Sequence, residues 1–343
     1  MQNDISRHWA LLTAFVPGEM LTAQARQVES FGMAGIQAWQ VWAAPWPTLS
    51  HCAAVTERVQ LASGVANALT RSPFETALTA IDIDRLSGGR FILGLGPSIR
   101  AWTQGFYGSA YDDPLPRLRE AIEIIRLVIE KGHTGELTSF EGRYHQHDWS
   151  ELLATLGPPL RPEIPIWLGV TQPNSVRLAG EIADGVIGHP IWTTDWINNK
   201  VMPTLEGSLA KAGKDRAGFH YNQWFWTAIN NDRAEAINDA KATTAFYASM
   251  GQYEPFFAAH GFEKEARACQ EAMLAKDLAG FVGAITDEMA QTFVMAGTPD
   301  DIRKRVEEVW DTCDSFCLVP PMAGLEPEKM LFYIGTIAET FYG

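Results

Sequence analysis

The stretch Ser87-Gly-Gly-Arg-Phe-Ile-Leu-Gly-Leu-Gly-Pro-Ser98 (SGGRFILGLGPS) places a GxG pair directly after an apolar run. Such a pair belongs either to the phosphate loop of a dinucleotide-binding sheet or to the exit of a buried barrel strand. The dinucleotide fingerprint GxGxxG requires a third glycine and a helix that begins at once. Ile99 stands where that glycine is required, and the next strong helical pattern runs over Pro116–Lys131. The stretch therefore indicates a strand whose tight exit needs glycines, and not a Rossmann phosphate loop.

The residues before this strand predict a helix that ends just ahead of it. Ser72-Pro-Phe-Glu75 combines a capping serine, a proline at the first helical position and an acidic residue. Apolar residues then recur at helical spacing, and Ser87-Gly88-Gly89 ends the helix. The continuous apolar run Phe91–Gly96 is typical of a parallel strand that is buried on both faces.

Apolar or β-branched runs of this kind alternate with helical patterns along the whole chain. The predicted strands are Trp9–Phe15, Gly35–Val41, Val59–Val65, Phe91–Gly96, Pro165–Val170, Gly185–His189, Tyr221–Ile229 and Ser315–Val319. Eight strand-then-helix units predict an α/β fold, a (β/α)8 TIM barrel, as one domain over residues 1–343. Longer segments after strands 4 and 7 predict insertions: a hairpin over residues 135–149 and added helices over residues 251–285.

The composition of the chain argues against several classes of binding partner. The chain has 343 residues, of which 46% are hydrophobic, and a formal net charge of −14. This charge argues against nucleic acid or an anionic membrane as a partner. No apolar run is long enough to span a membrane, and the first residues do not resemble an export signal, so we expect a cytoplasmic protein. The four cysteines are too scattered for a disulfide framework or a metal site, and we expect no metal.

The active site of a barrel lies at the carboxyl ends of its strands. The predicted ends are Ala14 and Phe15; Trp39, Gln40 and Trp42; Ser63 to Asn67; Gly96 to Ser98; Gly169 to Gln172; and Gly188 to Pro190. These ends are rich in glycine, amides, small polar side chains and tryptophan, with few carboxylates and no lysine. They suit a flat ring that the backbone approaches closely, and they do not suit a glycosidase or a metal hydrolase.

Several of these ends have two interpretations on their residues alone. Gly169–Ser175 fits an ordinary capped helix or a helix N-terminus that holds a phosphate. Gly64 fits either a turn glycine or a glycine that lets the backbone come near a ligand. His189 fits either a ligand contact or a packed histidine. Trp102 and Phe106 fit an aromatic wall for a substrate or plain loop packing. His145 and His147 are more typical of a solvated hairpin than of a metal site.

Three segments resemble the luciferase-like superfamily of flavin- and deazaflavin-dependent oxidoreductases. They are LASGVANALTRSPFETALTAIDIDRLSGGRFILGLGPS (61–98), PIWLGVTQPNSVRLAGEIADGVIGH (165–189) and MAGTPDDIRKRVEEV (295–309). Their order and spacing extend the resemblance from about Gly35 to Val309. The resemblance implies a barrel that binds FMN or coenzyme F420 at the strand ends, with a non-prolyl cis peptide that corresponds to Gly64–Val65.

The resemblance also implies which residues form the site. The expected cofactor-binding residues are Ser63, Gly64, Val65, Ala66, Asn67, Gly96, Ser98, Gly169, Val170, Thr171, Gln172, Gly188 and His189. The candidate catalytic residues are Gln40 and His189, and the candidate substrate pocket consists of Trp39, Trp42, Trp102 and Phe106. The segment Trp39–Pro45 departs from the family because it lacks the acidic residue or histidine that related dehydrogenases often carry there. Basic residues for a phosphate are few, with Arg71 and Arg177 the nearest candidates.

The resemblance implies an oxidoreductase that transfers hydride between coenzyme F420 and a small organic substrate. We expect this protein to form a homodimer and to bind neither nucleic acid nor a membrane. F420 is preferred because GVAN, RSP and LSGGRFILGLGPS look most like that branch. Two alternatives are an FMN-dependent monooxygenase, which uses reduced flavin and oxygen, and a non-catalytic flavin-binding barrel. Since the cofactor supplies the reactivity and the protein mainly positions it, the residues separate these alternatives poorly.

Overall fold

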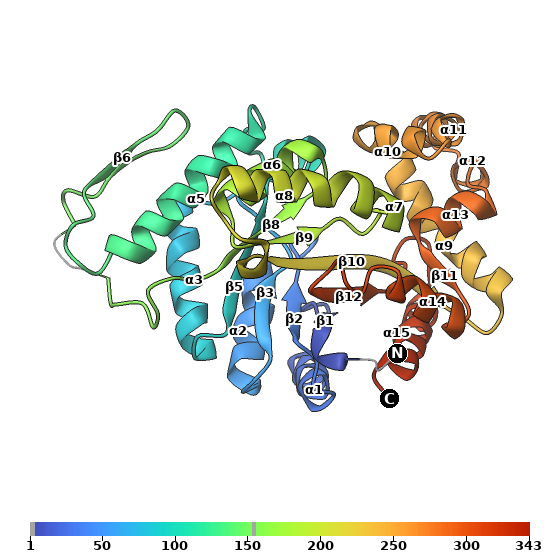
Figure 1. The fold of residues 1–343 in the computed structure, drawn as a ribbon, viewed down its shortest axis with the longest axis horizontal. Helices are drawn as coiled ribbons and strands as arrows, with labels where there is room; N and C mark the ends of the chain where they lie inside the picture. The colour runs from blue at the N-terminus through green and yellow to red at the C-terminus, as the bar shows by residue number, and fades with distance from the viewer. Residues whose placement is uncertain (1–3, 153–155) are drawn as a thin grey trace. The chain divides into compact units, whose positions relative to one another are not determined.

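A computed structural model describes residues 4–152 and 156–343. Its main sheet, whose strands are labelled in Figure 1, has the strand order β11-β10-β12-β1-β2-β3-β5-β8-β9. Because β10 also pairs with β9, eight strands close into a ring. The strands of this sheet are β1 (His8–Leu11), β2 (Gly35–Ala38), β3 (Gln60–Ser63), β4 (Ala66–Asn67), β5 (Phe91–Gly96), β8 (Ile166–Val170), β9 (Gly185–Gly188), β10 (His220–Ile229), β11 (Met295–Gly297) and β12 (Ser315–Val319). The predicted (β/α)8 barrel is confirmed.

The strand predictions hold best where the apolar run is continuous. Phe91–Gly96 and Ser315–Val319 have the predicted bounds. The first strand ends at Leu11 instead of Phe15, and the third ends at Ser63. After Ser63 the chain leaves the β3 ladder, and Ala66 and Asn67 pair instead with Leu95 and Gly96 of β5 as β4. The strands β4 and β11 are too short to produce a recognisable alternation, so the sequence did not predict them.

The chain divides into two compact units, and the first comprises Ser6–Gly188 and Asn199–Asn222. Its larger helices are α1 (Gly18–Ser30), α2 (Pro45–Val55), α3 (Pro73–Ser87), α5 (Pro114–Lys131), α6 (Pro173–Ile182) and α8 (Met202–Lys211). The short turn η3 (Arg216–Gly218) also lies in this unit, whereas η1 (Ile5–Arg7) and the π-helical η2 (Ile197–Val201) each contain residues of both units. Helix α2 packs on β2 and β3, α3 on β5, and α6 on β8 and β9. The apolar side chains between these helices and strands form the core of the unit.

A short helix, α4 (Arg100–Gly105), follows β5 closely. The sequence predicted a loop and no helix between Gly96 and Pro116, and this expectation was wrong. Only Thr103 of α4 is buried, so the segment has no apolar stripe that could reveal a helix. The following helix α5 begins at Pro114, two residues earlier than predicted.

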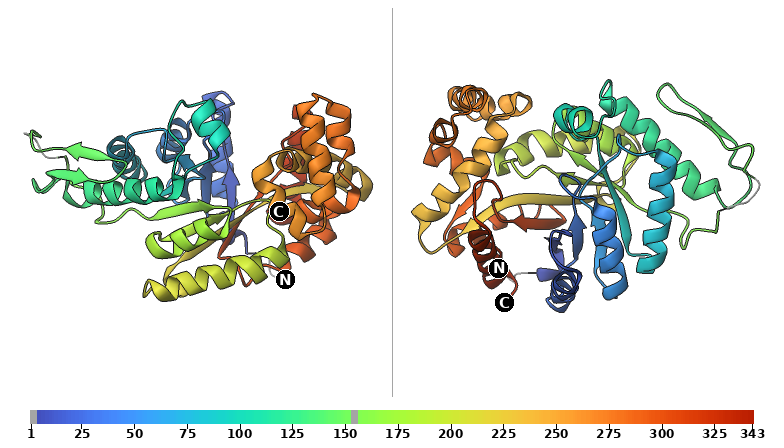
Figure 2. Two further views of the ribbon diagram at one scale, coloured as in Figure 1. Left: turned by 90° about the horizontal axis from the view of Figure 1, so that it is seen from above. Right: turned by 180° about the vertical axis from the view of Figure 1, so that it is seen from behind.

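The predicted hairpin lies within this first unit. Strands β6 (Ser139–Glu141) and β7 (Gln146–Asp148) pair antiparallel, and they extend away from α5 (Figure 2). The rings of His145 and His147 stack with centroids 6.5 Å apart, and His147 stacks on Trp149 at 5.0 Å. The described ranges contain no group of three or more His, Cys, Asp or Glu residues that could hold a metal.

The second unit comprises His189–Asn198, Gln223–Gly343 and, at the start of the described chain, Asp4 and Ile5. Its helices are α7 (Thr194–Trp196), α9 (Arg233–Ala248), η4 (Gly251–Tyr253), α10 (Glu254–Ala259), α11 (Glu263–Leu274), α12 (Leu278–Gly283), α13 (Asp287–Phe293), α14 (Pro299–Glu307) and α15 (Pro327–Phe341). The elements from η4 to α12 are the added helices predicted over residues 251–285. In the part of the chain that the structure describes, no helix is both long and apolar enough to cross a bilayer. All four cysteines are buried free thiols.

Candidate active site

The first unit brings most of the predicted site residues to one edge of the sheet. Strands β2, β3, β5, β8 and β9 are consecutive neighbours, and all their pairings are parallel. Their carboxyl ends therefore lie side by side. The residues placed there are Trp39 and Gln40, Ser63 to Asn67, Gly96 to Ser98, Gly169 to Gln172, and Gly188. His189 is the next residue of the chain, and it belongs to the second unit.

The glycines of the opening stretch make room for the exit of β3. A Cβ atom at Gly94 would lie 1.7 Å from the carbonyl oxygen of Ser63, which is a backbone atom that cannot move aside. Strand β5 can therefore approach this exit only with glycine at position 94. The GxG pair belongs to a buried strand, as predicted, but Gly94 is needed for the close approach of β3 and not for a turn at the exit of β5.

Val65 lies at the centre of the candidate site. The peptide bond between Gly64 and Val65 is cis. A Cβ atom at Gly96 would lie 3.0 Å from Cγ2 of Val65, and one at Gly169 would lie 3.0 Å from its Cγ1. The Val65 side chain thus occupies space that two glycines leave open at the ends of β5 and β8. At these two strand ends the glycines therefore face the Val65 side chain.

Gln40 makes hydrogen bonds with both ends of its side-chain amide. Its Oε1 accepts the backbone N–H of Asn67 at 2.9 Å, and its Nε2 donates to Oγ1 of Thr70 at 3.2 Å. Its backbone N–H also donates to the carbonyl oxygen of Val65 at 3.2 Å. An amide does not titrate in the physiological range, and both polar ends of this one bond to the loop after β3. The structure gives Gln40 the geometry of a residue that supports this loop.

His189 is enclosed by tyrosines within the second unit. Its Nε2 lies 3.2 Å from the hydroxyl oxygen of Tyr253, and its ring packs edge-on against Tyr247 at 5.2 Å. The N–H of Ile191 donates to Nδ1 at 3.4 Å, which places the proton of the neutral ring on Nε2. Burial lowers the pKa of His189 to about 3, so the imidazole is neutral at pH 7. This environment is that of a packed histidine and does not suit an imidazolium that donates a proton.

Sequence reasoning missed the two tyrosines. Tyr247 lies at the end of α9 and Tyr253 in η4, far along the chain from His189. Their only sequence signal is the position of Tyr253 in the insertion predicted after strand 7. Burial raises the pKa of Tyr247 well above its ordinary value, so its hydroxyl stays protonated.

Aromatic rings gather after β2 and β5 in the first unit. The ring centroid of Trp42 lies 5.4 Å from that of Phe106 and 6.5 Å from that of Trp102. Trp42 and Phe106 nevertheless remain 68% and 59% exposed. The hydroxyl of the neighbouring Tyr107 donates to the carbonyl oxygen of Val41 at 3.2 Å and ties the two loops together. Large apolar rings that pack on one another yet stay open to solvent fit a wall for a flat or apolar molecule.

The N-terminus of α6 is closed by its own residues. The Ser175 hydroxyl accepts the N–H groups of Thr171 and Gln172 at 3.0 and 3.1 Å, and it donates to the carbonyl oxygen of Gln172 at 2.7 Å. Gly169–Ser175 therefore leads into a capped helix, as one interpretation predicted, and the phosphate interpretation stays a prediction. An anion bound at this end would either accept a hydrogen bond from the Ser175 hydroxyl or replace that hydroxyl as the acceptor for the N–H groups of Thr171 and Gln172.

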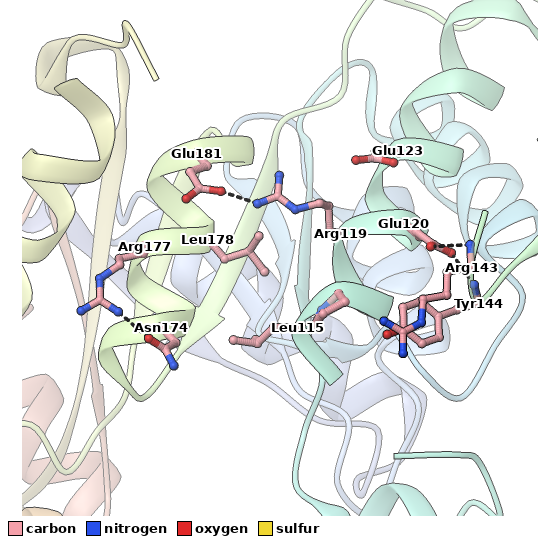
Figure 3. A pocket seen from close by; sticks show the side chains of 11 residues that line it. Leu115, Arg119, Glu120, Glu123, Arg143, Tyr144, Asn174, Arg177, Leu178 and Glu181 are labelled. Atoms are coloured by element: carbon pink, nitrogen blue, oxygen red, sulfur yellow. Dashed lines mark hydrogen bonds and ion pairs between the residues drawn. The ribbon is translucent and has the colours of Figure 1, made fainter. Parts of the chain in front are cut away.

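A groove of about 630 Å³ lies between α5, α6 and the hairpin, outside the strand ends (Figure 3). Arg119 forms an ion pair with Glu181, and Arg177 hydrogen-bonds to Asn174. The Glu120 carboxylate accepts the backbone N–H groups of residues 143, 144 and 145. Although burial acts in the opposite direction, these donors hold the pKa of Glu120 below its ordinary value. These charges hold the helices and the hairpin together, and Arg177 does not point to a phosphate site here.

Comparison with known proteins assigns the chain to a family of barrel enzymes. Residues 6–314 match the family described as luciferase-like monooxygenase, and the chain belongs to this family. A 5,10-methylenetetrahydromethanopterin reductase of Archaeoglobus fulgidus is 31% identical over 266 residues, which cover 76% of this chain and 76% of the relative. A putative coenzyme F420-dependent oxidoreductase of Mycobacterium tuberculosis is 31% identical over 293 residues, covering 80% and 82% of the two chains.

Solved structures share the same barrel. The coenzyme F420-dependent tetrahydromethanopterin reductase from Methanopyrus kandleri has a TM-score of 0.81 at 23% identity, covering 98% of this chain and 99% of that one. A type II Baeyer–Villiger monooxygenase of Pseudomonas putida, solved with FMN, has a TM-score of 0.66 at 17% identity, covering 96% and 94%. At these identities the likeness establishes the fold.

Proposed function

We propose that the protein is an oxidoreductase that transfers hydride between coenzyme F420 and a small organic substrate. The observation that carries the proposal is the packing at the exit of β3. Gly94 makes room there for the backbone of Ser63, and Gly96 and Gly169 make room for the Val65 side chain. This packing places a small side chain and tightly approaching backbone, instead of bulky side chains, at the strand ends where a planar tricyclic ring would lie. The two relatives at 31% identity, one of them named as F420-dependent, support this cofactor.

The residues at the strand ends fit a flat, largely neutral ring. Ser63–Asn67, Gly96, Ser98, Gly169–Gln172 and Gly188 would hold it, and His189 follows them in the chain. This set contains no carboxylate and no lysine. When bound, the deazaflavin supplies or accepts a hydride, while the chain binds the ring and limits the access of water.

The aromatic residues after β2 and β5 would hold the substrate. Trp42, Trp102 and Phe106 form a cluster with two exposed rings, and the partly buried Trp39 lies at the end of β2. Stacking on such rings favours an apolar or moderately polar organic molecule. Gln40 and His189 are engaged with other residues, and we assign them the role of positioning their neighbours.

A second candidate function is that of an FMN-dependent monooxygenase. It is favoured by the shared fold of the FMN-bound Baeyer–Villiger monooxygenase. The strand-end residues accept either ring, because both cofactors present three fused planar rings to the backbone.

Titration of the purified protein with F420 and, separately, with FMN tests the proposal. Ring fluorescence reports binding, and we expect micromolar affinity for F420 and none for FMN. Binding of FMN alone overturns the F420 assignment in favour of the monooxygenase. Binding of neither ring overturns the oxidoreductase assignment, and binding without turnover of any substrate supports a non-catalytic barrel.

We further propose that residues 1–343 act as one domain and that the protein forms a homodimer in the cytoplasm. The boundary between the two compact units falls inside β10, between Asn222 and Gln223. A strand that belongs to both units supports a single cooperative domain. One unfolding transition in urea, and a mass of about twice 37.9 kDa in light scattering, are the expected results.

A further inference from the structure

Three polar side chains outside the aromatic cluster converge on the exit of β3. They are Gln40 after β2, Asn67 in β4 and Thr103 in α4. We propose that these residues form a brace that holds the Val65–Asn67 segment in the position that binds the ring, without touching the ring themselves. The inference rests on the proposed function, and it assigns Asn67 a positioning role in place of direct cofactor contact.

Gln40 holds the segment at both of its ends. Its backbone N–H donates to the carbonyl oxygen of Val65 at 3.2 Å, and its Oε1 accepts the N–H of Asn67 at 2.9 Å. Its Nε2 donates to Oγ1 of Thr70 at 3.2 Å, and that hydroxyl donates to the carbonyl oxygen of Asn67 at 3.1 Å. One residue at the end of β2 therefore engages the segment and the turn that follows it.

Asn67 carries the brace on to β5. Its Nδ2 donates to Oγ1 of Thr103 at 2.9 Å, and its Oδ1 accepts the N–H of Leu69 at 3.0 Å. The Thr103 hydroxyl in turn donates to the carbonyl oxygen of Pro97, which follows β5, at 3.1 Å. Asn67 and Thr103 are 4% and 0% exposed, so water cannot replace either side chain in this network.

The brace links the exits of three neighbouring strands, because β2 pairs with β3 and β3 with β5. Each polar group named here has a partner within the brace or the adjacent turn. Loss of one side chain leaves buried partners unsatisfied, and the segment shifts to find others. A shift of the backbone beside Val65 changes the surface that faces the ring, even though no ring contact has been removed.

The hypothesis makes a graded prediction for the affinity of F420. Gln40→Met removes both amide hydrogen bonds, and Thr103→Val removes the hydroxyl; we expect each to raise the dissociation constant tenfold or more. Gln40→Glu keeps the acceptor for Asn67 but loses the donor to Thr70, and we expect a smaller loss. Thr103→Ser keeps the hydroxyl, and we expect affinity within threefold of wild type.

The matched control is Gln104→Met on the same helix. Gln104 is exposed and bonds only to Arg100 within the described contacts, at 3.2 Å, so its replacement leaves F420 affinity unchanged. Urea unfolding of every variant shows whether it is folded at the temperature of the titration. If Gln40→Met does not fold, the comparison of Thr103→Val with Thr103→Ser decides the question.

The outcomes separate the brace from the proposed function. Wild-type protein that binds neither F420 nor FMN overturns the proposed function and with it the brace. Wild-type protein that binds F420 while folded Gln40→Met and Thr103→Val bind within threefold overturns the brace alone. Equal losses of F420 affinity in Thr103→Ser and Thr103→Val also overturn the brace. Only the serine variant keeps the hydroxyl, so equal losses would mean that the hydroxyl does not contribute to the affinity. A changed fluorescence spectrum of the bound ring in Gln40→Met supports altered positioning.

Discussion

The hydroxyl of Ser63 makes two hydrogen bonds to Gly94 on the neighbouring strand. It donates to the carbonyl oxygen of Gly94 at 2.8 Å and accepts the N–H of Gly94 at 2.9 Å. The β3–β5 register runs through Leu61↔Phe91 and Ala62↔Ile92 and then stops. A side chain thus satisfies the backbone of β5 at the point where the backbone of β3 turns away, which allows this turn to be buried.

Substitutions at Gly94 and at Ser63 should show separately how the close backbone contact and the hydrogen bonds contribute to the free energy of unfolding. We expect Gly94→Ala to destabilise the fold by about 3 kcal/mol or more, because the new Cβ would meet the Ser63 carbonyl at 1.7 Å. Ser63→Ala should cost about 1–3 kcal/mol, as two buried backbone groups lose their partner. Gly105→Ala is the control, since nothing lies within 4 Å of its added Cβ. Equal urea midpoints for Gly94→Ala and Gly105→Ala would contradict this account.

A compensating pair tests the fit of Val65 against the strand ends. The Cβ of Gly169→Ala would lie 3.0 Å from Cγ1 of Val65 and push this side chain aside. We expect Gly169→Ala to weaken the affinity for the cofactor ring, about tenfold for a displacement that costs ~1.4 kcal/mol. Val65→Ala removes the clash, so the double variant should bind more tightly than Gly169→Ala alone. Additive losses in a double-mutant cycle of fluorescence titrations would show that the two positions do not interact.

Arg90 closes the opposite end of the same strands. Its guanidinium donates to the carbonyl oxygens of Ala53, Thr56, Val59 and Ser87 and to the Thr56 hydroxyl. Arg90→Met should destabilise the protein by about 3 kcal/mol or more, because these acceptors lose a charged donor inside the fold. Arg58→Met, at an exposed position nearby, should change stability by less than about 0.5 kcal/mol. Urea unfolding of both variants measures the difference, and similar midpoints would rule out this role for Arg90.

The burial of His189 predicts a dependence of stability on pH. Its pKa is about 3 in the folded protein, against roughly 6.5 in an unfolded chain, so the unfolded state binds the proton more readily. The contribution of the neutral ring is fully present above about pH 6.5 and is lost progressively as the pH falls toward 3. In that window His189 alone should lower the free energy of unfolding by about 1.4 kcal/mol per pH unit.

The His189→Gln variant serves as the reference for this measurement, because glutamine does not titrate. We expect the free energies of unfolding of wild type and variant, measured in urea at pH 7, 6 and 5, to converge as the pH falls. Parallel curves over this range would mean that His189 keeps an ordinary pKa in the folded protein.

The site was only partly accessible to prediction. The strand ends that carry Ser63–Asn67, Gly96–Ser98 and Gly169–Gln172 follow from the pattern of apolar runs, because parallel strands of a barrel end at the same edge. The engagement of Gln40 with Asn67 and Thr70 could not be predicted in this way. It depends on how far the loop after β3 leaves the ladder, and no local pattern of residues reports that distance.

The sequence alone indicated the eight barrel strands, their alternation with helices and the resemblance to the family, because apolar periodicity and short motifs are properties of neighbouring residues. It also excluded the dinucleotide loop, since the third glycine is absent at Ile99. Only the tertiary structure decided what the glycines of the opening stretch accommodate and which partners His189 and Gln40 have. Those contacts join residues far apart in the chain, and they arise from strand register and packing, to which every part of the core contributes.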